Sequence, residues 1–304
     1  MSATAEAVGR PADQPVGKPA TGTRLKDRGF LLLLLFCVGL SVLMLVVLLV
    51  DIVADGAGNL TWDFITSFSS INADQSGIQA AFWGTIWLMV VCALFIVPVG
   101  VATAVYLEEY ADERRWYNRL IELNIQNLAA VPSIVYGILG LAFLVRGPLS
   151  LGPVVLAGGL TLGLLVLPVV IIAAREAIRA VPPSIREGSM ALGATQWQTI
   201  WRQVLPASVP GIATGVILAL ARAIGETAPL IVVGASVFIA FNPDGLNAFF
   251  TAMPIQIFEW ISRPSNDVND YKPLAAAGIL LLMIMLLFMN SIAIWLRNRY
   301  EQKW

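Results

Sequence analysis

The sequence predicts an all-α integral membrane protein whose chain crosses the bilayer six times. Hydrophobic residues make up 58% of the 304 positions and charged residues only 13%, whereas about a quarter of the residues in a soluble domain are charged. A membrane-spanning helix needs about 20 predominantly apolar residues. Six stretches of the chain have this character: 30–53, 80–106, 127–145, 152–173, 207–240 and 274–296.

The first of these stretches follows a tail that is rich in Ala, Pro, Gly and Thr, a composition typical of disorder. The run from Phe30 to Val50 holds no charged residue. It is longer than the apolar core of about 7–15 residues in a cleaved signal peptide, so we expect a retained membrane helix. We divide the chain into a disordered cytoplasmic tail, a first membrane helix with its outer loop, and a larger membrane domain, over residues 1–29, 30–79 and 80–300.

The distribution of basic residues predicts the orientation of the chain. Fifteen of the 19 lysines and arginines fall on one predicted side, in the N-terminal tail, in the loops 107–126 and 174–206, and after the last span. The alternate loops hold three basic residues in all. Because loops rich in Lys and Arg stay in the cytoplasm, both termini are predicted to be cytoplasmic. The remaining basic residue, Arg222, lies inside a predicted span.

The composition argues against several classes of function. The net charge of −1 gives no sign of a nucleic-acid partner. The chain holds no histidine, the commonest general base and metal ligand. Cys37 and Cys92 both lie in apolar runs and are interpreted as buried hydrophobic residues. We therefore expect no metal site and no cofactor bound by this chain, and a membrane enzyme is disfavoured.

The loop between the fourth and fifth spans is predicted to hold two short helices. Pro182 and Pro183 end the preceding span. Ser184 and Glu187 have the spacing of a capping box, which marks a helix start. Gly193 is placed to end that short helix as the residue after its C-cap.

A second capping box, Thr195 to Gln198, begins the second short helix, and Pro206 is expected to begin the next span. This helix carries Trp197 and Trp201. Exposed tryptophans are typical of a docking surface for another protein, but they are also enriched at the membrane interface. Both interpretations of the loop remain open at this point.

A resemblance decides between them. The segment 187–206, EGSMALGATQWQTIWRQVLP, is similar to the EAA loop of ABC-importer permeases. Four positions match the motif at its spacing: Glu187, Gly193, Leu205 and Pro206. Gly188 and Ser189 stand where the motif has alanines, and Gln203 stands where isoleucine is usual. In that family the loop binds in a groove of a separate ATPase subunit. This chain has no phosphate-binding P-loop of its own.

The resemblance implies an ATPase-coupling role for the 184–206 loop, carried by Glu187, Gly193, Thr195, Trp197, Leu205 and Pro206. Other segments resemble the PstA family of phosphate-importer permeases: 127–137, 221–230, 251–264 and 274–300. This implies the type I ABC-importer permease fold over residues 80–300, in a bacterial or archaeal plasma membrane. It also implies phosphate import with a PstC-like permease as heterodimer partner, a PstB-like ATPase dimer that uses ATP, and a PstS-like binding protein.

Arg222 and Glu226 are the charged residues of the fifth predicted span. Because they are four positions apart on a helix, they are able to form an ion pair. An unpaired charge at the bilayer centre costs about 2.5–3.5 kcal/mol on insertion scales, so such residues are functional candidates. Gly225 and Pro229 predict a helix break beside them.

Two interpretations of this region remain open. In the first, Arg222, Glu226, Thr227 and Ser133 line a substrate pathway, because the planar guanidinium suits phosphate oxygens. In the second, the pair is structural. The alternative substrates are other oxyanions such as molybdate and sulfate, and a stand-alone channel is a further alternative. The segment 106–123 is expected to be a solvated cytoplasmic helix, and the loop 241–273 either closes the outer mouth or forms an interfacial re-entrant or surface helix.

Overall fold

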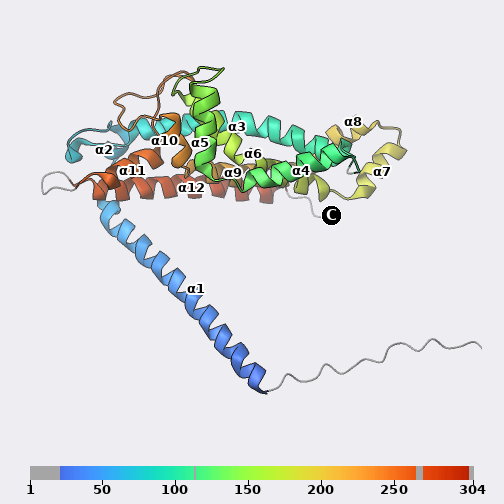
Figure 1. Cartoon of the computed structure of the whole chain (residues 1–304), viewed down its shortest axis with the longest axis horizontal. Helices are drawn as coiled ribbons and strands as arrows, with labels where there is room; N and C mark the ends of the chain where they lie inside the picture. Colours follow the sequence, from blue (N-terminus) through green and yellow to red (C-terminus); the bar gives the residue numbers. More distant parts are fainter. Residues whose placement is uncertain (1–20, 113, 265–269, 301–304) are drawn as a thin grey trace, which may run out of the picture. The chain divides into compact units, whose positions relative to one another are not determined.

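The computed structural model describes residues 21–112, 114–264 and 270–300. Within these ranges the chain is helical, and its β structure is one isolated antiparallel bridge between Val154 and Phe249. Residues 1–51 and 52–304 form two compact units, and each is described by itself. The helices of the second unit that are long enough to cross a membrane are α3 (Gln79–Val105), α6 (Val155–Arg179), α9 (Leu205–Ile224) and α12 (Lys272–Tyr300) (Figure 1).

The first unit contains most of α1 (Thr21–Gly56), whose described side chains from Arg28 to Leu48 are exposed. This helix starts before the predicted boundary at residue 30, because Leu, Lys and Arg are good helix formers. Residues 1–20 of the predicted disordered tail lie outside the described residues. Cys92 is buried as expected, but Cys37 is exposed on α1, because its own unit offers that helix no neighbour.

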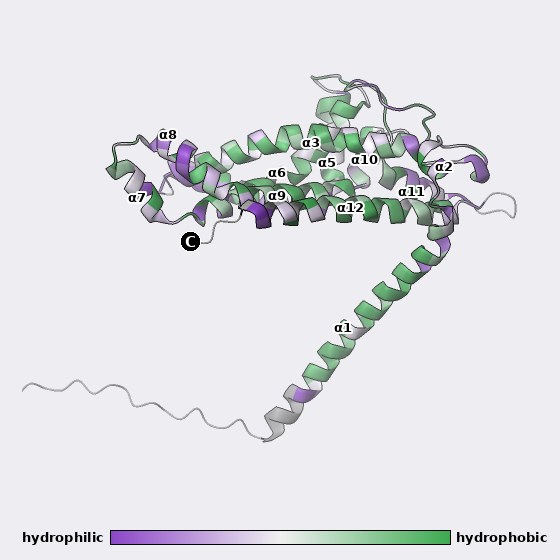
Figure 2. Cartoon of the chain, turned by 180° about the vertical axis from the view of Figure 1, so that it is seen from behind, coloured by the Kyte–Doolittle hydropathy of each residue, from purple (hydrophilic) through white to green (hydrophobic). Residues whose placement is uncertain are grey.

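The long helices of the second unit pack in the order α3, α6, α9 and α12. Small residues allow close approach between them, as is usual for membrane helices. A Cβ atom on Gly215 of α9 would lie 2.3 Å from the Cβ of Ala173 on α6. Figure 2 shows hydrophobic residues along these helices and hydrophilic residues at the ends of the bundle. This is the pattern expected of segments that cross an apolar layer.

The prediction of an all-α membrane protein is confirmed. Among the described residues, five helices are long and apolar enough to cross a membrane, and there is a sixth span if one bent pair counts as a single span. That pair is α4 (Trp116–Ala129) followed by the helical segment Ser133–Val145, which comprises α5 (Ser133–Leu139) and a π-helical stretch. The two parts meet at 108°. The predicted continuous span 127–145 is therefore wrong. Pro132 lacks an N–H and disfavours a helical residue before it, so the helix breaks there.

The fifth apolar stretch, 207–240, is divided beside Gly225 and Pro229, where the sequence predicts a helix break. The helix ends at Ile224, and a separate short helix, α10 (Ala228–Val233), follows after three residues. Gly234 then adopts φ = 94°, a left-handed conformation that ends α10. At its other end this span begins at Gln196 and not at Pro206, because a π-helical turn over Ile200–Val204 carries the helix through that proline.

The 184–206 loop contains the first expected short helix, α7 (Pro183–Ala191), whereas the second, α8 (Gln196–Thr199), is continuous with the fifth span. The capping box at Thr195 is confirmed: its hydroxyl accepts from the Gln198 N–H at 3.3 Å, and the Gln198 side chain accepts from the Thr195 N–H at 3.0 Å. Gly193 has φ = 88°, as expected of a residue after a C-cap. The predicted cap at Ser184 is wrong, because α7 begins at Pro183 and Pro182 is its N-cap.

Thr195 caps a helix and Ser184 does not, so alanine substitutions at these two hydroxyl residues are expected to differ in their effect on stability. We expect Thr195→Ala to lower the free energy of unfolding by about 1 kcal/mol, because it removes the side-chain acceptor at a helix N-cap. Ser184→Ala is the matched control and is expected to leave this free energy unchanged. Unfolding of the detergent-solubilised protein by added denaturing detergent checks both variants. Equal effects would contradict the assignment of the cap to Thr195.

Candidate functional site

Arg222 and Glu226 form an ion pair at the end of α9, with Nε and Oε1 3.6 Å apart. The Glu226 side chain is 20% exposed and the Arg222 side chain is 46% exposed. The helix ends two residues after this arginine, with Gly225 as its C-cap. The pair is thus held within this one chain, and the guanidinium keeps enough open surface to contact a second anion.

Two broken helices pack against each other beside this pair. α5 starts after the break at Pro132, and α10 starts after the break at Gly225. Gly137 of α5 approaches Pro229 of α10 so closely that an added Cβ would lie 2.7 Å from the Pro229 Cα. Tyr136 spans the bend between α4 and α5, because its hydroxyl donates to the carbonyl of Leu128 at 2.9 Å.

The other two predicted pathway residues stand at the starts of these short helices. Ser133 is the first residue of α5, and Thr227 is the N-cap residue of α10. Both side chains are half-buried, and neither makes a capping hydrogen bond to its helix. The tertiary structure therefore brings the elements that carry Ser133 and Thr227 into contact, although the two residues are 94 positions apart in the sequence.

The loop that resembles an ATPase-docking loop presents an exposed surface. Trp197 and Trp201 stack on each other with their ring centroids 5.6 Å apart, and both remain exposed. Leu192 is 92% exposed at the turn between α7 and α8. Between the two helices lies a groove of about 400 Å³, lined by Ser184, Gly188, Ser189, Leu192, Gln198 and Arg202. Exposed apolar side chains beside a groove are typical of a surface that binds another protein.

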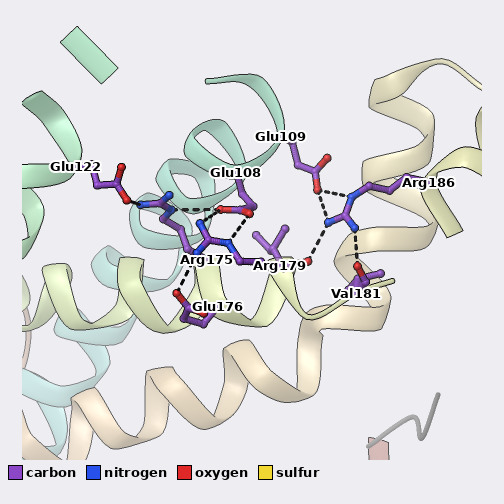
Figure 3. A network of polar contacts seen from close by, with 9 residues as sticks. Glu108, Glu109, Glu122, Arg175, Glu176, Arg179, Val181 and Arg186 are labelled. Carbon is purple, nitrogen blue, oxygen red and sulfur yellow. Dashed lines mark hydrogen bonds and ion pairs between the residues drawn. The ribbon is translucent and has the colours of Figure 1, made fainter. Parts of the chain in front are cut away.

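A third group of residues was missed by the sequence analysis. The segment 106–123 was expected to be a solvated helix, but Glu108 and Glu109 are largely buried in ion pairs with arginines of α6 and α7 (Figure 3). The two glutamates stand in a π-helical turn that extends α3. The sequence gives one signal for this network. Two adjacent glutamates lie in one cytoplasmic segment, and several arginines lie in the next one, 174–206. This signal does not by itself show which charges pair.

The outer segment packs as part of the bundle. α11 (Met253–Ser262) has a buried face that includes Met253, Ile255 and Trp260. The N–H of Met253 donates to the hydroxyl of Thr85 on α3 at 2.9 Å. α11 also packs against α12. The alternative of a helix that lies on the surface is therefore wrong for this part of the predicted loop 241–273.

Comparison with known proteins places the chain in a family. Residues 96–303 match the family described as the binding-protein-dependent transport system inner membrane component. The chain belongs to this family. The permease is 31% identical over 276 residues to the probable ABC transporter permease protein YqgI of Bacillus subtilis, a match that covers 88% of this chain and 93% of that protein.

A second relative is the phosphate transport system permease protein PstA 1 of Mycobacterium tuberculosis. It is 39% identical over 191 residues, which cover 62% of this permease and 61% of the relative. Among solved structures, the inward-facing MetNI methionine ABC transporter matches with a TM-score of 0.59 and 16% identity, over 73% of this permease and 95% of that chain. The expected fold of an ABC-importer permease is confirmed.

Membership in this family gives the permease its general role. It is a multi-pass inner-membrane component of a transport system that depends on a binding protein. Such a system has an ATPase subunit and a substrate-binding protein as partners of the permease. The predicted localisation is confirmed, and so is the prediction that the chain is a transport permease.

Proposed function

We propose that this permease is a subunit of an ATP-driven importer of inorganic phosphate. The observation that carries the proposal is the 39% identity to a phosphate transport system permease. The site supports it, because a half-exposed arginine stands where a membrane helix breaks. A guanidinium is a permanently charged fork that matches the oxygens of phosphate.

Glu226 has two roles in this proposal. Its carboxylate lies 3.6 Å from Arg222 and weakens the attraction of the guanidinium for an anion. Weak binding suits a permease, since a bound ion has to leave again. Phosphate that carries a proton is also able to donate a hydrogen bond to a carboxylate, whereas sulfate is not. Glu226 therefore favours phosphate over a fully deprotonated oxyanion.

The permease works in this proposal as one half of a heterodimer with a PstC-like chain, and a PstS-like protein delivers phosphate from outside. A PstB-like ATPase dimer binds the loop through the exposed surface of α7 and α8, which includes Glu187 and Trp197. ATP binding draws the ATPase subunits together, and the 184–206 loop transmits their movement. Access to the pathway near Arg222 then switches from one side of the membrane to the other, with both termini in the cytoplasm.

Uptake of radiolabelled phosphate by the reconstituted complex in lipid vesicles tests this function. We expect uptake that requires the ATPase, ATP and the binding protein, and that an equal concentration of sulfate or molybdate does not suppress. Equal or faster transport of sulfate or molybdate would assign another oxyanion to the same machine. Phosphate flux without ATP would instead indicate a channel.

A further inference from the structure

The ion-pair network beside the loop holds together four separate elements (Figure 3). Two of its acidic members, Glu108 and Glu109, lie in the π-helical turn Tyr106–Tyr110 at the end of α3, and Glu122 lies on α4. The basic members lie at the end of α6 and on α7. The family match gives the network no role of its own, and the proposed pathway does not use it.

Arg186 of α7 is the member with the most hydrogen bonds. Its Nε and Nη2 donate to Oε1 of Glu109 at 3.0 and 2.7 Å. Its Nη1 donates to the carbonyl of Val181 at 2.6 Å, and Nη2 also donates to the carbonyl of Ile178 at 2.9 Å. The carbonyls at a helix C-terminus lack partners within the helix. One side chain of the loop thus binds both α3 and the end of α6.

Glu109 receives a second contact from the other half of the loop. The side-chain amide of Gln196 on α8 donates to the backbone carbonyl of Glu109 at 2.6 Å. The loop's two short helices are also joined to each other, because the Thr199 hydroxyl donates to the Ser189 hydroxyl at 2.9 Å. Both halves of the loop are therefore attached to Glu109, whose side chain is 9% exposed.

The neighbouring Glu108 connects the same turn to α6 and onward to α4. Arg179 of α6 binds both of its carboxylate oxygens, at 2.9 and 3.0 Å. Arg175, one helical turn earlier, lies 3.5 Å from Glu108 and donates to Glu122 of α4 at 2.9 Å. α4 leads into the bend before α5, and α5 packs against α10 beside Arg222.

We propose that Arg186 and Glu109 are positioning residues that transmit movement of the 184–206 loop to the membrane helices, with Arg175 and Glu122 passing it to α4. The inference rests on the proposed function, because it assigns the loop to an ATPase. An ion pair suits this task, since its directional hydrogen bonds pull as well as push. Apolar contacts alone would oppose movement of the loop toward α3, but they would not hold the loop when it moves away from α3.

The test compares two arginine variants of the reconstituted complex. Arg186→Gln removes the ion pair that joins α7 to Glu109 and leaves the contact from Gln196 of α8 in place. Arg179→Gln is the matched control, because the bidentate pair that it removes joins α6 to Glu108 in the same network. We expect Arg186→Gln to reduce the phosphate imported per ATP hydrolysed by about tenfold, the usual size of a coupling between sites. We expect Arg179→Gln to leave this ratio unchanged.

The ratio of phosphate imported to ATP hydrolysed distinguishes a positioning role of Arg186 from a purely structural role. A variant that only destabilises the fold lowers uptake and the ATPase activity stimulated by the permease together, through loss of assembled complex. A parallel fall of both activities in Arg186→Gln, or equal ratios for the two variants, overturns the proposal. The double variant Glu109→Gln with Arg186→Gln removes the charges without leaving a buried carboxylate unpaired. It is expected to stay uncoupled, because an amide pair cannot replace the bonds to Ile178 and Val181.

A second measurement does not depend on the substrate. Ser133→Cys, in a background with Cys37 and Cys92 replaced by alanine, reports access of a thiol reagent to the start of α5. We expect ATP binding by the ATPase to change the labelling rate in the parent protein and in Arg179→Gln, but not in Arg186→Gln. A nucleotide-dependent change that persists in Arg186→Gln overturns the coupling proposal. If labelling behaves as expected but phosphate is not imported, the substrate assignment fails and the coupling proposal stands.

Discussion

Arg222→Gln is expected to reduce phosphate uptake severely while the complex still assembles. Glutamine keeps a polar side chain but removes the positive charge of the half-exposed guanidinium. A hydrogen bond between a charged group and an anion contributes about 1.5–3 kcal/mol. We therefore expect the rate of uptake to fall by about 100-fold, which corresponds to about 2.7 kcal/mol. Labelled-phosphate uptake by equal amounts of purified complex measures it.

The double variant Arg222→Gln with Glu226→Gln decides what the charge does. If the ion pair serves only the fold, removing both charges leaves no unpaired carboxylate, and uptake is restored. If Arg222 contacts the anion, the double variant stays as inactive as the single one, and we expect this outcome. Recovery of more than half of the native rate in the double variant would contradict the pathway assignment and direct the search for the anion site to the partner permease.

Among the substitutions proposed for stability measurements, Gly84→Ala is expected to lower the free energy of unfolding the most. Gly84 of α3 lies against the backbone of Thr251, and an added Cβ would come within 2.0 Å of the Thr251 carbonyl oxygen. Neither backbone is free to move, because the Met253 N–H is bonded to the hydroxyl of Thr85, the next residue of α3. Overpacking of this kind costs about 1–3 kcal/mol and occasionally more. We expect a loss of about 3 kcal/mol.

The matched control for this variant is Gly188→Ala on α7. Beyond its own turn of helix, no described atom lies within 4 Å of the position that its Cβ would take. Alanine favours a helix over glycine by about 1 kcal/mol, so this variant is expected to keep or slightly raise stability. Unfolding of the purified permease in mixed detergent micelles compares the two. Equal stability of both variants would show that α3 and the segment around Thr251 separate more easily than their hydrogen bonds indicate.

Local features of the site were predictable from local chemistry. Arg222 and Glu226 are four positions apart on a helix, so their ion pair follows from helical geometry. The cap at Thr195 and the left-handed Gly193 follow from residue preferences at helix ends. Prediction failed where two signals overlapped, as at Ser184, because Pro183 is itself a favoured first residue of a helix.

The network around Glu109 could not be predicted in the same way. Glu109 and Arg186 are 77 positions apart, and no periodicity relates them. A polar segment with mixed charges has the same sequence pattern whether its charged side chains face water or form ion pairs with each other. Only the packing of α3 against α6 places the turn that holds Glu109 beside α7. Burial then decides which charges pair, since an unpaired charge is costly away from water.

By itself the sequence determined that the chain is a membrane protein, where its apolar helices lie, and that its loop and its Arg–Glu motif resemble those of an importer permease. These properties depend on the transfer of side chains into an apolar layer and on contacts within one helical turn. The tertiary structure alone decided that α5 meets α10 at their breaks and that the loop is fastened to α3. Contacts between distant segments depend on how helices pack, and packing depends on shape complementarity that no short stretch of sequence contains.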